Sequence, residues 1–174
     1  IAEVRVDFAG QSYIATEYAG QYHAAFPNPS VPGAYNFTVT VMVNMVSKLS
    51  GWQMAMEYNS SILNLTGVEP KPSGGIFAPK IPIVVTPWIN ITDTGNYFVM
   101  IGATLLGGAS VTTSDPKPLC TLNFTTVGFG YSPMRLGTDD SPIKTPSSIY
   151  DPTKNWWYPS YVCKLSSSDM SSIK

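Results

Sequence analysis

The feature that most constrains the fold of this sequence is an alternation of apolar and polar residues between positions 50 and 70. Every second residue from Trp52 to Tyr58 is large and apolar, and the residues between them are Gln, Ala and Glu. A period of two is typical of a β-strand with one buried face. Polar residues at 59–61 predict a turn, and a shorter alternation begins at Leu63. The stretch therefore predicts two strands joined by a turn.

The same alternation recurs along the chain, most clearly from Tyr35 to Val46. Prolines cannot donate to a β-ladder, so the three prolines at 76–87 predict an edge strand or a loop there. The alternation is lost between residues 9 and 34, where the composition allows a short helix around 17–25. We expect further strands at residues 1–8, 88–92, 97–106, 119–127, 134–136 and 155–165.

Many short strands separated by turns are typical of an all-β fold with two packed sheets. The 174 residues suffice for one domain with a sizeable core. We therefore predict an antiparallel β-sandwich of the jelly-roll or a related Greek-key type. Residues 1–34 are expected to form an N-terminal strand followed by an irregular insertion, and residues 35–174 to form the sandwich with an aromatic C-terminal strand.

Composition argues against several classes of function. Only 12% of residues are charged and the net charge is -1, whereas a nucleic-acid-binding surface needs clustered Lys and Arg. The sequence contains no run of about 18 apolar residues, so it predicts no membrane-spanning helix. His23 is the single histidine, and neither a GxSxG nor an HExxH motif accompanies it. We expect neither catalysis nor a cofactor.

Calcium is the one metal that the sequence leaves open. Asp139 and Asp140 are oxygen donors of the type that calcium takes in loops. Their ordinary role is turn formation, because an Asp side chain accepts hydrogen bonds from nearby backbone N–H groups. They are therefore weak metal candidates.

Two features indicate an extracellular chain from which a signal has been removed. Cys120 and Cys163 are the only cysteines and have no CxxC or His neighbour, so a single disulfide is favoured over a metal site or a nucleophile. Five N-x-Ser/Thr sequons occur, four of them with the asparagine on the outward phase of a strand and one in a turn, where a glycan can be carried. The sequon asparagines are Asn36, Asn59, Asn64, Asn90 and Asn123.

The aromatic run Trp156, Trp157 and Tyr158 has two interpretations. It could stack on sugar rings, as in a carbohydrate-binding module. Consecutive residues of a strand point to opposite faces, so at most one of the two tryptophans can enter the core. Packing beneath residues 9–34 is the interpretation we prefer.

Residues 37–149 resemble cohesin domains, especially the cohesin-like domains of archaeal surface proteins. The resemblance rests on the segments FTVTVMV at 37–43, GWQ at 51–53, VMIGATLLGG at 99–108 and LCTLNFTTVG at 119–128, in that order. It implies a nine-stranded extracellular jelly roll that acts by protein contact, with a dockerin-like protein as a possible partner. The segments before and after this region depart from the usual module.

The first strand suggests a form of assembly. Val4, Val6 and Phe8 share one phase, and the 26 residues of 9–34 can reach up to about 85 Å. The strand could therefore enter a neighbouring molecule, and such head-to-tail strand addition builds a filament. We favour a cell-surface homopolymer of this kind. The alternatives are pairing of the strand within its own chain, a module that binds a dockerin-like protein, and a carbohydrate-binding module.

Overall fold

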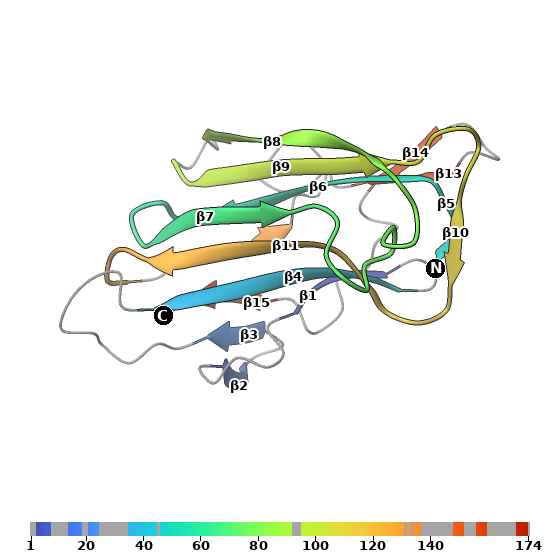
Figure 1. The fold of residues 1–174 in the computed structure, drawn as a ribbon. Helices are drawn as coiled ribbons and strands as arrows, with labels where there is room; N and C mark the ends of the chain where they lie inside the picture. The colour runs from blue at the N-terminus through green and yellow to red at the C-terminus, as the bar shows by residue number, and fades with distance from the viewer. Residues whose placement is uncertain are drawn as a thin grey trace.

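The computed structural model describes residues 3–7, 14–18, 21–24, 35–44, 46–91, 95–130, 132, 134–136, 148–151, 156–159 and 170–173. All regular elements in these ranges are β-strands. Most of the strands lie in two facing layers (Figure 1).

One layer is a four-stranded antiparallel sheet. Its strand order is β1-β4-β11-β7, so β11 and β4 are central. The strands are β1 (Glu3–Asp7), β4 (Asn36–Asn44), β11 (Lys117–Thr126) and β7 (Leu63–Glu69).

The other layer is a six-stranded sheet with the order β14-β13-β6-β9-β8, in which β12 also pairs with β6. β12 lies opposite Met56 and Glu57, and β13 lies opposite residues 51–53, so these two strands pair with different parts of β6. The strands are β14 (Trp156–Pro159), β13 (Ser148–Asp151), β6 (Gly51–Tyr58), β9 (Tyr97–Thr104), β8 (Ile83–Ile91) and β12 (Arg135–Leu136).

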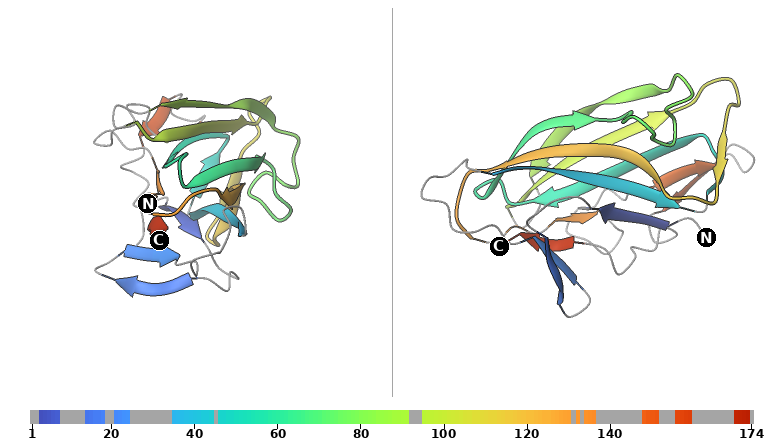
Figure 2. Two further views of the ribbon diagram at one scale, coloured as in Figure 1. Left: turned by 90° about the vertical axis from the view of Figure 1, so that its left-hand side faces the viewer. Right: turned by 60° about the horizontal axis from the view of Figure 1, so that its bottom comes forward.

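Two smaller sheets complete the described structure. β5 (Val46–Leu49) pairs with β10 (Val111–Thr113) at one end of the sandwich (Figure 1). The hairpin of β2 (Ile14–Tyr18) and β3 (Gln21–Ala24) projects from the sandwich, with β15 (Met170–Ile173) parallel to β3 (Figure 2).

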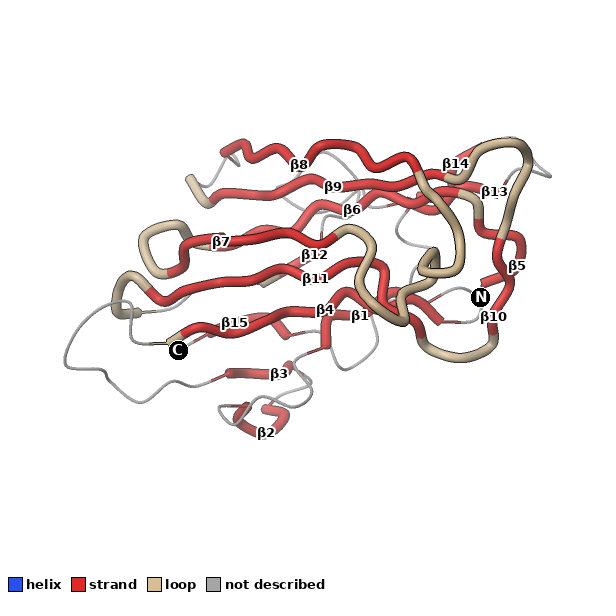
Figure 3. The backbone as a smooth tube through the Cα atoms, in the orientation of Figure 1, coloured by secondary structure: helices blue, strands red, loops and turns tan. Residues whose placement is uncertain are grey.

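The loop of residues 70–82 carries the chain from β7 in one layer to β8 in the other (Figure 3). Ile76 and Phe77 in this loop are buried, at 3% and 2% exposure, and belong to the main core. The backbone N–H of Ile76 donates to the carbonyl of Pro118 over 2.8 Å, which ties the loop to the start of β11. The loop therefore closes one end of the sandwich.

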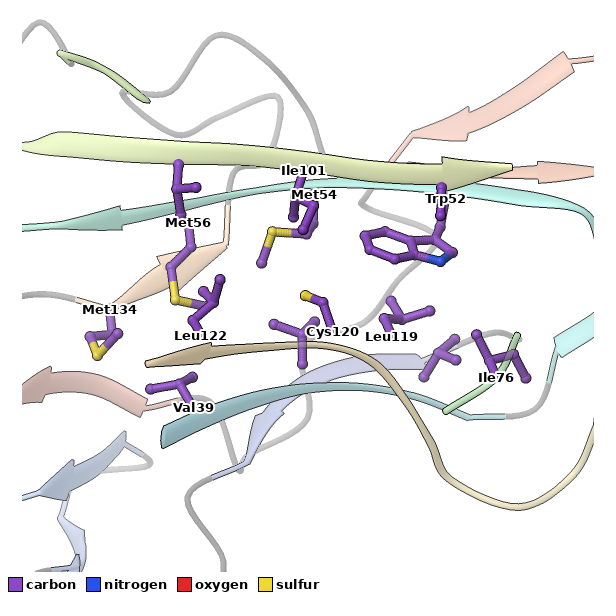
Figure 4. Close-up of a cluster of buried hydrophobic side chains, with 14 of the residues drawn as sticks. Val39, Trp52, Met54, Met56, Ile76, Ile101, Leu119, Cys120, Leu122 and Met134 are labelled. Carbon is purple, nitrogen blue, oxygen red and sulfur yellow. The ribbon is translucent and has the colours of Figure 1, made fainter. Parts of the chain in front are cut away.

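The core is the apolar interface between β6 and β9 on one side and β4 and β11 on the other. Trp52, Met54 and Met56 project from β6 toward Cys120 and Leu122 of β11 (Figure 4). All five side chains are at most 1% exposed. The flexible thioethers of the two methionines can fill gaps between branched neighbours, which helps a sandwich core reach close packing.

An aromatic cluster continues the core toward the end where β7 begins. Phe37 and Phe124 stack with their ring centroids 5.6 Å apart, and the Tyr58 ring meets Phe124 edge-on at 5.2 Å. Tyr58 also meets Tyr97 edge-on at 6.1 Å. Such offset and edge-on contacts are the favoured arrangements of aromatic rings and link β4, β11, β6 and β9.

The predicted all-β sandwich is confirmed. Each strand expected from alternation is present in the described residues, although residues 160–165 of the expected last strand lie outside them. Residues 83–91 form one edge strand although Pro87 lies within it. The helix allowed around residues 17–25 is wrong, because Ile14–Tyr18 and Gln21–Ala24 are strands. Short strands at 111–113, 148–151 and 170–173 were not predicted. The division of the chain at residue 34 stays a prediction.

We expect the core to be sensitive to the loss of a single buried side chain. Leu122 is fully buried, so Leu122→Ala should lower the free energy of unfolding by about 2–5 kcal/mol. The matched control is Leu106→Ala, since Leu106 is 64% exposed and its removal should change stability by no more than about 0.5 kcal/mol. Urea unfolding followed by tryptophan fluorescence measures both. Equal losses in the two variants would contradict this packing.

We expect Tyr58 to make stability depend on pH in alkaline solution. Burial, with a smaller effect from Tyr97, raises the pKa of the Tyr58 phenol from about 10 to about 12. The folded state therefore holds this proton more tightly, and stability should fall as pH rises from about 10 to about 12. The loss should be on the order of 2–3 kcal/mol. Urea unfolding of the wild type and of Tyr58→Phe over this pH range isolates the effect, and identical pH dependence in the two proteins would refute it.

Candidate protein-binding surface

The exposed apolar side chains of the described residues gather on one strand. Of nine large hydrophobic side chains that are exposed there, six lie on or beside β8. Their exposures range from 42% for Trp88 to 91% for Ile81. We call this group the β8 surface, which consists of Ile81, Ile83, Val85, Trp88, Ile89 and Ile91.

The β8 surface lies at the edge of the six-stranded sheet. Among the described strands, β8 pairs with β9 alone. A register shift between Val85 and Trp88 interrupts the ladder, and Pro87 between them has no N–H to donate. Both features hinder the addition of another strand to an edge. The exposed side chains, rather than the backbone edge, are therefore the groups available to a partner.

The Trp88 ring packs against a buried aromatic ring of the neighbouring strand. The Trp88 ring meets the ring of Phe98 on β9 edge-on, with centroids 5.6 Å apart. Phe98 is only 7% exposed and packs with Ala55 of β6 and with Met100, which is the cross-strand neighbour of Trp88. An exposed aromatic side chain on a fixed support loses little conformational entropy when a partner binds. Trp88 is thus suited to anchor a protein contact.

Glu57 lies near this cluster and is fully buried, although its place in the alternation of β6 suggested the solvent side. Its Oε1 atom accepts a 2.8 Å hydrogen bond from Nδ2 of Asn96. The register of β12 places Arg135 directly opposite Glu57. A buried carboxylate is costly unless it is paired or hydrogen-bonded. The hydrogen bond from Asn96 reduces this cost and links Glu57 of β6 to the segment that precedes β9.

The structure places β1 within its own sheet. β1 pairs antiparallel with β4 of the same chain, with Val4 opposite Val43 and Val6 opposite Val41. Phe8 lies outside the described residues. This pairing of β1 within its own chain is the alternative to strand exchange that the sequence left open. Exchange of β1 between molecules stays a prediction.

The sequon asparagines lie where the alternation placed them. Asn36, Asn64, Asn90 and Asn123 are exposed on strands. Asn59 begins a turn, where its side-chain oxygen accepts a hydrogen bond from the backbone of Ser61. The structure brings three of the exposed asparagines onto one sheet, whereas Asn90 lies on β8. Glycosylation itself stays a prediction.

Cys120 lies in the core of the sandwich with no exposed surface. Burial raises the pKa of its thiol far above the usual value, so the free thiol would be inert. Cys163 lies outside the described residues, and Cys120 has no disulfide partner within them. The disulfide therefore stays a prediction, and it would require Cys163 to enter the core.

The other predicted site residues are separate from the β8 surface in the strand order. Trp156, Trp157 and Tyr158 form most of β14, at the opposite edge of the six-stranded sheet from β8. Their roles in sugar binding or packing stay predictions. Asp139 and Asp140 lie outside the described residues. Within the ranges that the structure describes, no three His, Cys, Asp or Glu residues form a group that could hold a metal ion.

The described residues also contain no helix long and apolar enough to cross a membrane.

The sequence pattern could have revealed the apolar content of β8. It could not have revealed that these side chains are exposed, because that depends on β8 being at an edge.

Comparison with known proteins identifies the fold. No protein-family model matches the chain, and no curated protein does. Solved structures do match, and three are representative. A cohesin from Clostridium acetobutylicum has a TM-score of 0.55 at 15% identity, with 99% of this chain and 90% of that chain covered. The sixth cohesin of Acetivibrio cellulolyticus scaffoldin B, in complex with a dockerin, has a TM-score of 0.54 at 13% identity, with 99% and 97% covered.

The third structure is a non-cellulosomal cohesin from the hyperthermophilic archaeon Archaeoglobus fulgidus. Its TM-score is 0.54 at 11% identity, with 99% of this chain and 88% of that chain covered. The chain therefore has a cohesin-like fold, a jelly-roll β-sandwich, as the resemblance in the sequence implied.

We expect thiol labelling to decide how Cys120 is paired. Without reductant, a disulfide with Cys163 should leave no cysteine to react with iodoacetamide in guanidinium, whereas free thiols would give two labels by mass spectrometry. Two labels would contradict the disulfide. In the control Cys163→Ala, burial should keep Cys120 unlabelled in the native protein at pH 8 and expose it only in guanidinium.

Proposed function

We propose that this protein is a non-catalytic extracellular recognition module that binds a dockerin-like protein partner through the β8 surface. The observation that carries the proposal is the exposed Trp88 side chain, supported by Phe98 within a row of apolar residues on a cohesin-like fold.

The comparisons support a protein as the partner. Several structures with this fold were solved as cohesin–dockerin complexes, including ones from Acetivibrio cellulolyticus and Clostridium thermocellum. Fold alone does not define function, so the argument also needs a suitable surface on this chain. Exposed apolar patches on soluble proteins commonly mark interaction sites. The register with β9 puts Ile83, Val85 and Trp88 on one face of the sheet, which gives this part of the β8 surface such a patch.

The chemistry of the described residues supports binding rather than catalysis. The strongest pKa shifts among the described residues belong to Tyr58 and Cys120, and both side chains are buried in the core. The β8 surface offers only apolar side chains, and the amide of the neighbouring Asn90 is polar but uncharged. These groups can bind a partner but supply no general acid or base. An extracellular setting agrees with the five sequons and with the two cysteines.

The test is a binding experiment on matched variants. Secreted proteins of the native host are passed over the immobilised chain, and any protein retained is purified and titrated against each variant by calorimetry. Trp88→Ala should weaken binding about 30-fold or more, the usual effect of losing an interface anchor. Phe129→Ala, which removes an exposed aromatic side chain that follows β11 of the other sheet, should leave the affinity unchanged. Failure to find a one-to-one complex, or equal affinities in all variants, would refute the proposal.

A second candidate is the filament joined by strand exchange. All five residues of β1 pair with β4 at the outer edge of the four-stranded sheet, so β1 can be removed without breaking another ladder. The same register could be formed by β1 of a neighbouring molecule, because the chain between β1 and β4 is long enough to reach it. Its product would be a homopolymer at the cell surface.

A cross-link distinguishes the two ways of pairing. Arg5 lies directly opposite Met42, so Arg5→Cys combined with Met42→Cys should form a disulfide when oxidised. In a Cys163→Ala background, pairing within the chain gives monomers on a non-reducing gel, and exchange gives a ladder of multimers. The single variants are the controls. Electron microscopy of the uncross-linked protein should show fibres if exchange occurs, and monomers in both experiments would exclude the filament.

A further inference from the structure

Two identical tripeptides with the sequence Asn-Phe-Thr pair with each other across the four-stranded sheet. The first begins at Asn36 on β4 and the second at Asn123 on β11, and the strands are antiparallel. The Thr125 hydroxyl donates to Oδ1 of Asn36 over 2.5 Å, and the Thr38 hydroxyl donates to Oδ1 of Asn123 over 2.8 Å. Each asparagine thus bonds to the threonine of the other sequon.

A third sequon lies beside this pair on β7. Asn64 is the cross-strand neighbour of Thr125, on the side of β11 away from β4. The hydroxyl of Thr66, the last residue of the Asn64 sequon, donates to the backbone carbonyl of Asn123 over 3.1 Å. Adjacent strands are about 4.8 Å apart, so the three asparagines lie within about 10 Å of one another on one face.

The hydrogen bonds between the two sequons do not involve the side-chain nitrogen to which a glycan would be attached. The hydrogen bonds that Asn36 and Asn123 accept from the two threonines use the carboxamide oxygen, whereas an N-linked glycan is joined to the nitrogen. Gly67 faces Asn123 across the ladder, and a Cβ at this position would lie 3.2 Å from Nδ2 of Asn123. A larger residue would therefore crowd the atom that carries the sugar.

The positions next to these asparagines are polar and uncharged, and the first acidic residues in the register are Glu69, opposite Thr121, and Asp7, opposite Thr40. The outward positions within residues 36–40 of β4, 121–125 of β11 and 64–66 of β7 are Asn or Thr. Soluble surfaces usually carry Lys, Arg, Asp or Glu on about a quarter of their positions or more. A neutral Asn and Thr face lacks this source of solubility, and attached sugars would supply it.

We propose that Asn36, Asn64 and Asn123 carry N-linked glycans that form a single cluster over the outer face of β4, β11 and β7. This proposal is independent of the partner that binds at β8. It assigns one sheet face to carbohydrate and leaves the β8 surface, on the other sheet, for protein contact.

The modification requires a lipid-phosphate-linked oligosaccharide as donor. The amide nitrogen of asparagine attacks the anomeric carbon, the bond from that carbon to the phosphate oxygen breaks, and the lipid phosphate leaves. The nitrogen loses one proton to a base of the transferase. No atom changes oxidation state in a way that needs a redox partner.

Modification must precede the pairing of β4 with β11. The backbone of the Asn123 sequon is held in ladders on both sides, by β4 and by β7, so a transferase cannot enclose it in the folded sheet. The glycans are therefore added to the extended chain, and they remain compatible with folding because they project from the outer face.

Glycopeptide mass spectrometry of the chain secreted by its native host tests the cluster. Peptides containing Asn36, Asn64 and Asn123 should each carry a glycan, and Asn→Gln at each position should remove one glycan mass. Thr38→Ser keeps the sequon and the hydroxyl and should retain the glycan at Asn36. Asn44→Gln, outside any sequon, should not change the attached glycan mass. Unmodified peptides at all three positions, or glycans confined to Asn59 and Asn90, would overturn the proposal.

A second experiment tests the order of events. The unmodified chain made in a bacterial cytosol is folded, then incubated with an oligosaccharyltransferase and its lipid-linked donor. No sugar should be added at Asn36 or Asn123, whereas the same chain translocated during synthesis into vesicles with that enzyme should gain both. Addition to the folded chain at either residue would overturn the requirement for early modification.

Discussion

The whole molecule depends on the dry interface between two sheets. β6 contributes Trp52, Met54 and Met56 to one side of this interface, and β11 contributes Cys120 and Leu122 to the other. Burial of these side chains is the main favourable term available to a chain with few charges. Because β6 and β11 are each flanked by partners, the interface also fixes which strands are left at the edges. The position of β8, and hence its exposure, follows from the core.

The two sheets present different chemistry to solvent. One sheet ends in a strand of exposed isoleucine, valine and tryptophan, and the other shows asparagine and threonine across its central strands. Apolar side chains at an edge favour contact with another protein, whereas a neutral polar face has little to offer one. The fold thus separates the β8 surface, which suits protein recognition, from the Asn and Thr face of the other sheet, which suits attached glycans.

Alternation alone predicted most of the sandwich, because a strand with one buried face needs an apolar residue at every second position. It was less informative where both faces are covered. Glu57 is buried against Asn96, and Ala55 is buried beside Phe98, although both have the phase of solvent-facing residues. Across residues 9–34, a mixture of Tyr, Ala and Gly obscures the period, so a helix was allowed where β2 and β3 form a hairpin. The binding surface and the paired sequons depend on strand order and register, which local patterns do not contain.

The pairing of β4 with β11 also has a consequence in time. Asn36 and Thr125 are cross-strand neighbours but are 89 positions apart in the chain. At a synthesis rate of about 5–20 residues per second, β4 leaves the ribosome roughly 4–18 seconds before its partner strand is complete. During that interval the most regular strand of the protein has its central partner missing. The interval is an opportunity for modifying enzymes and a hazard of aggregation, and the same long-range contact creates both.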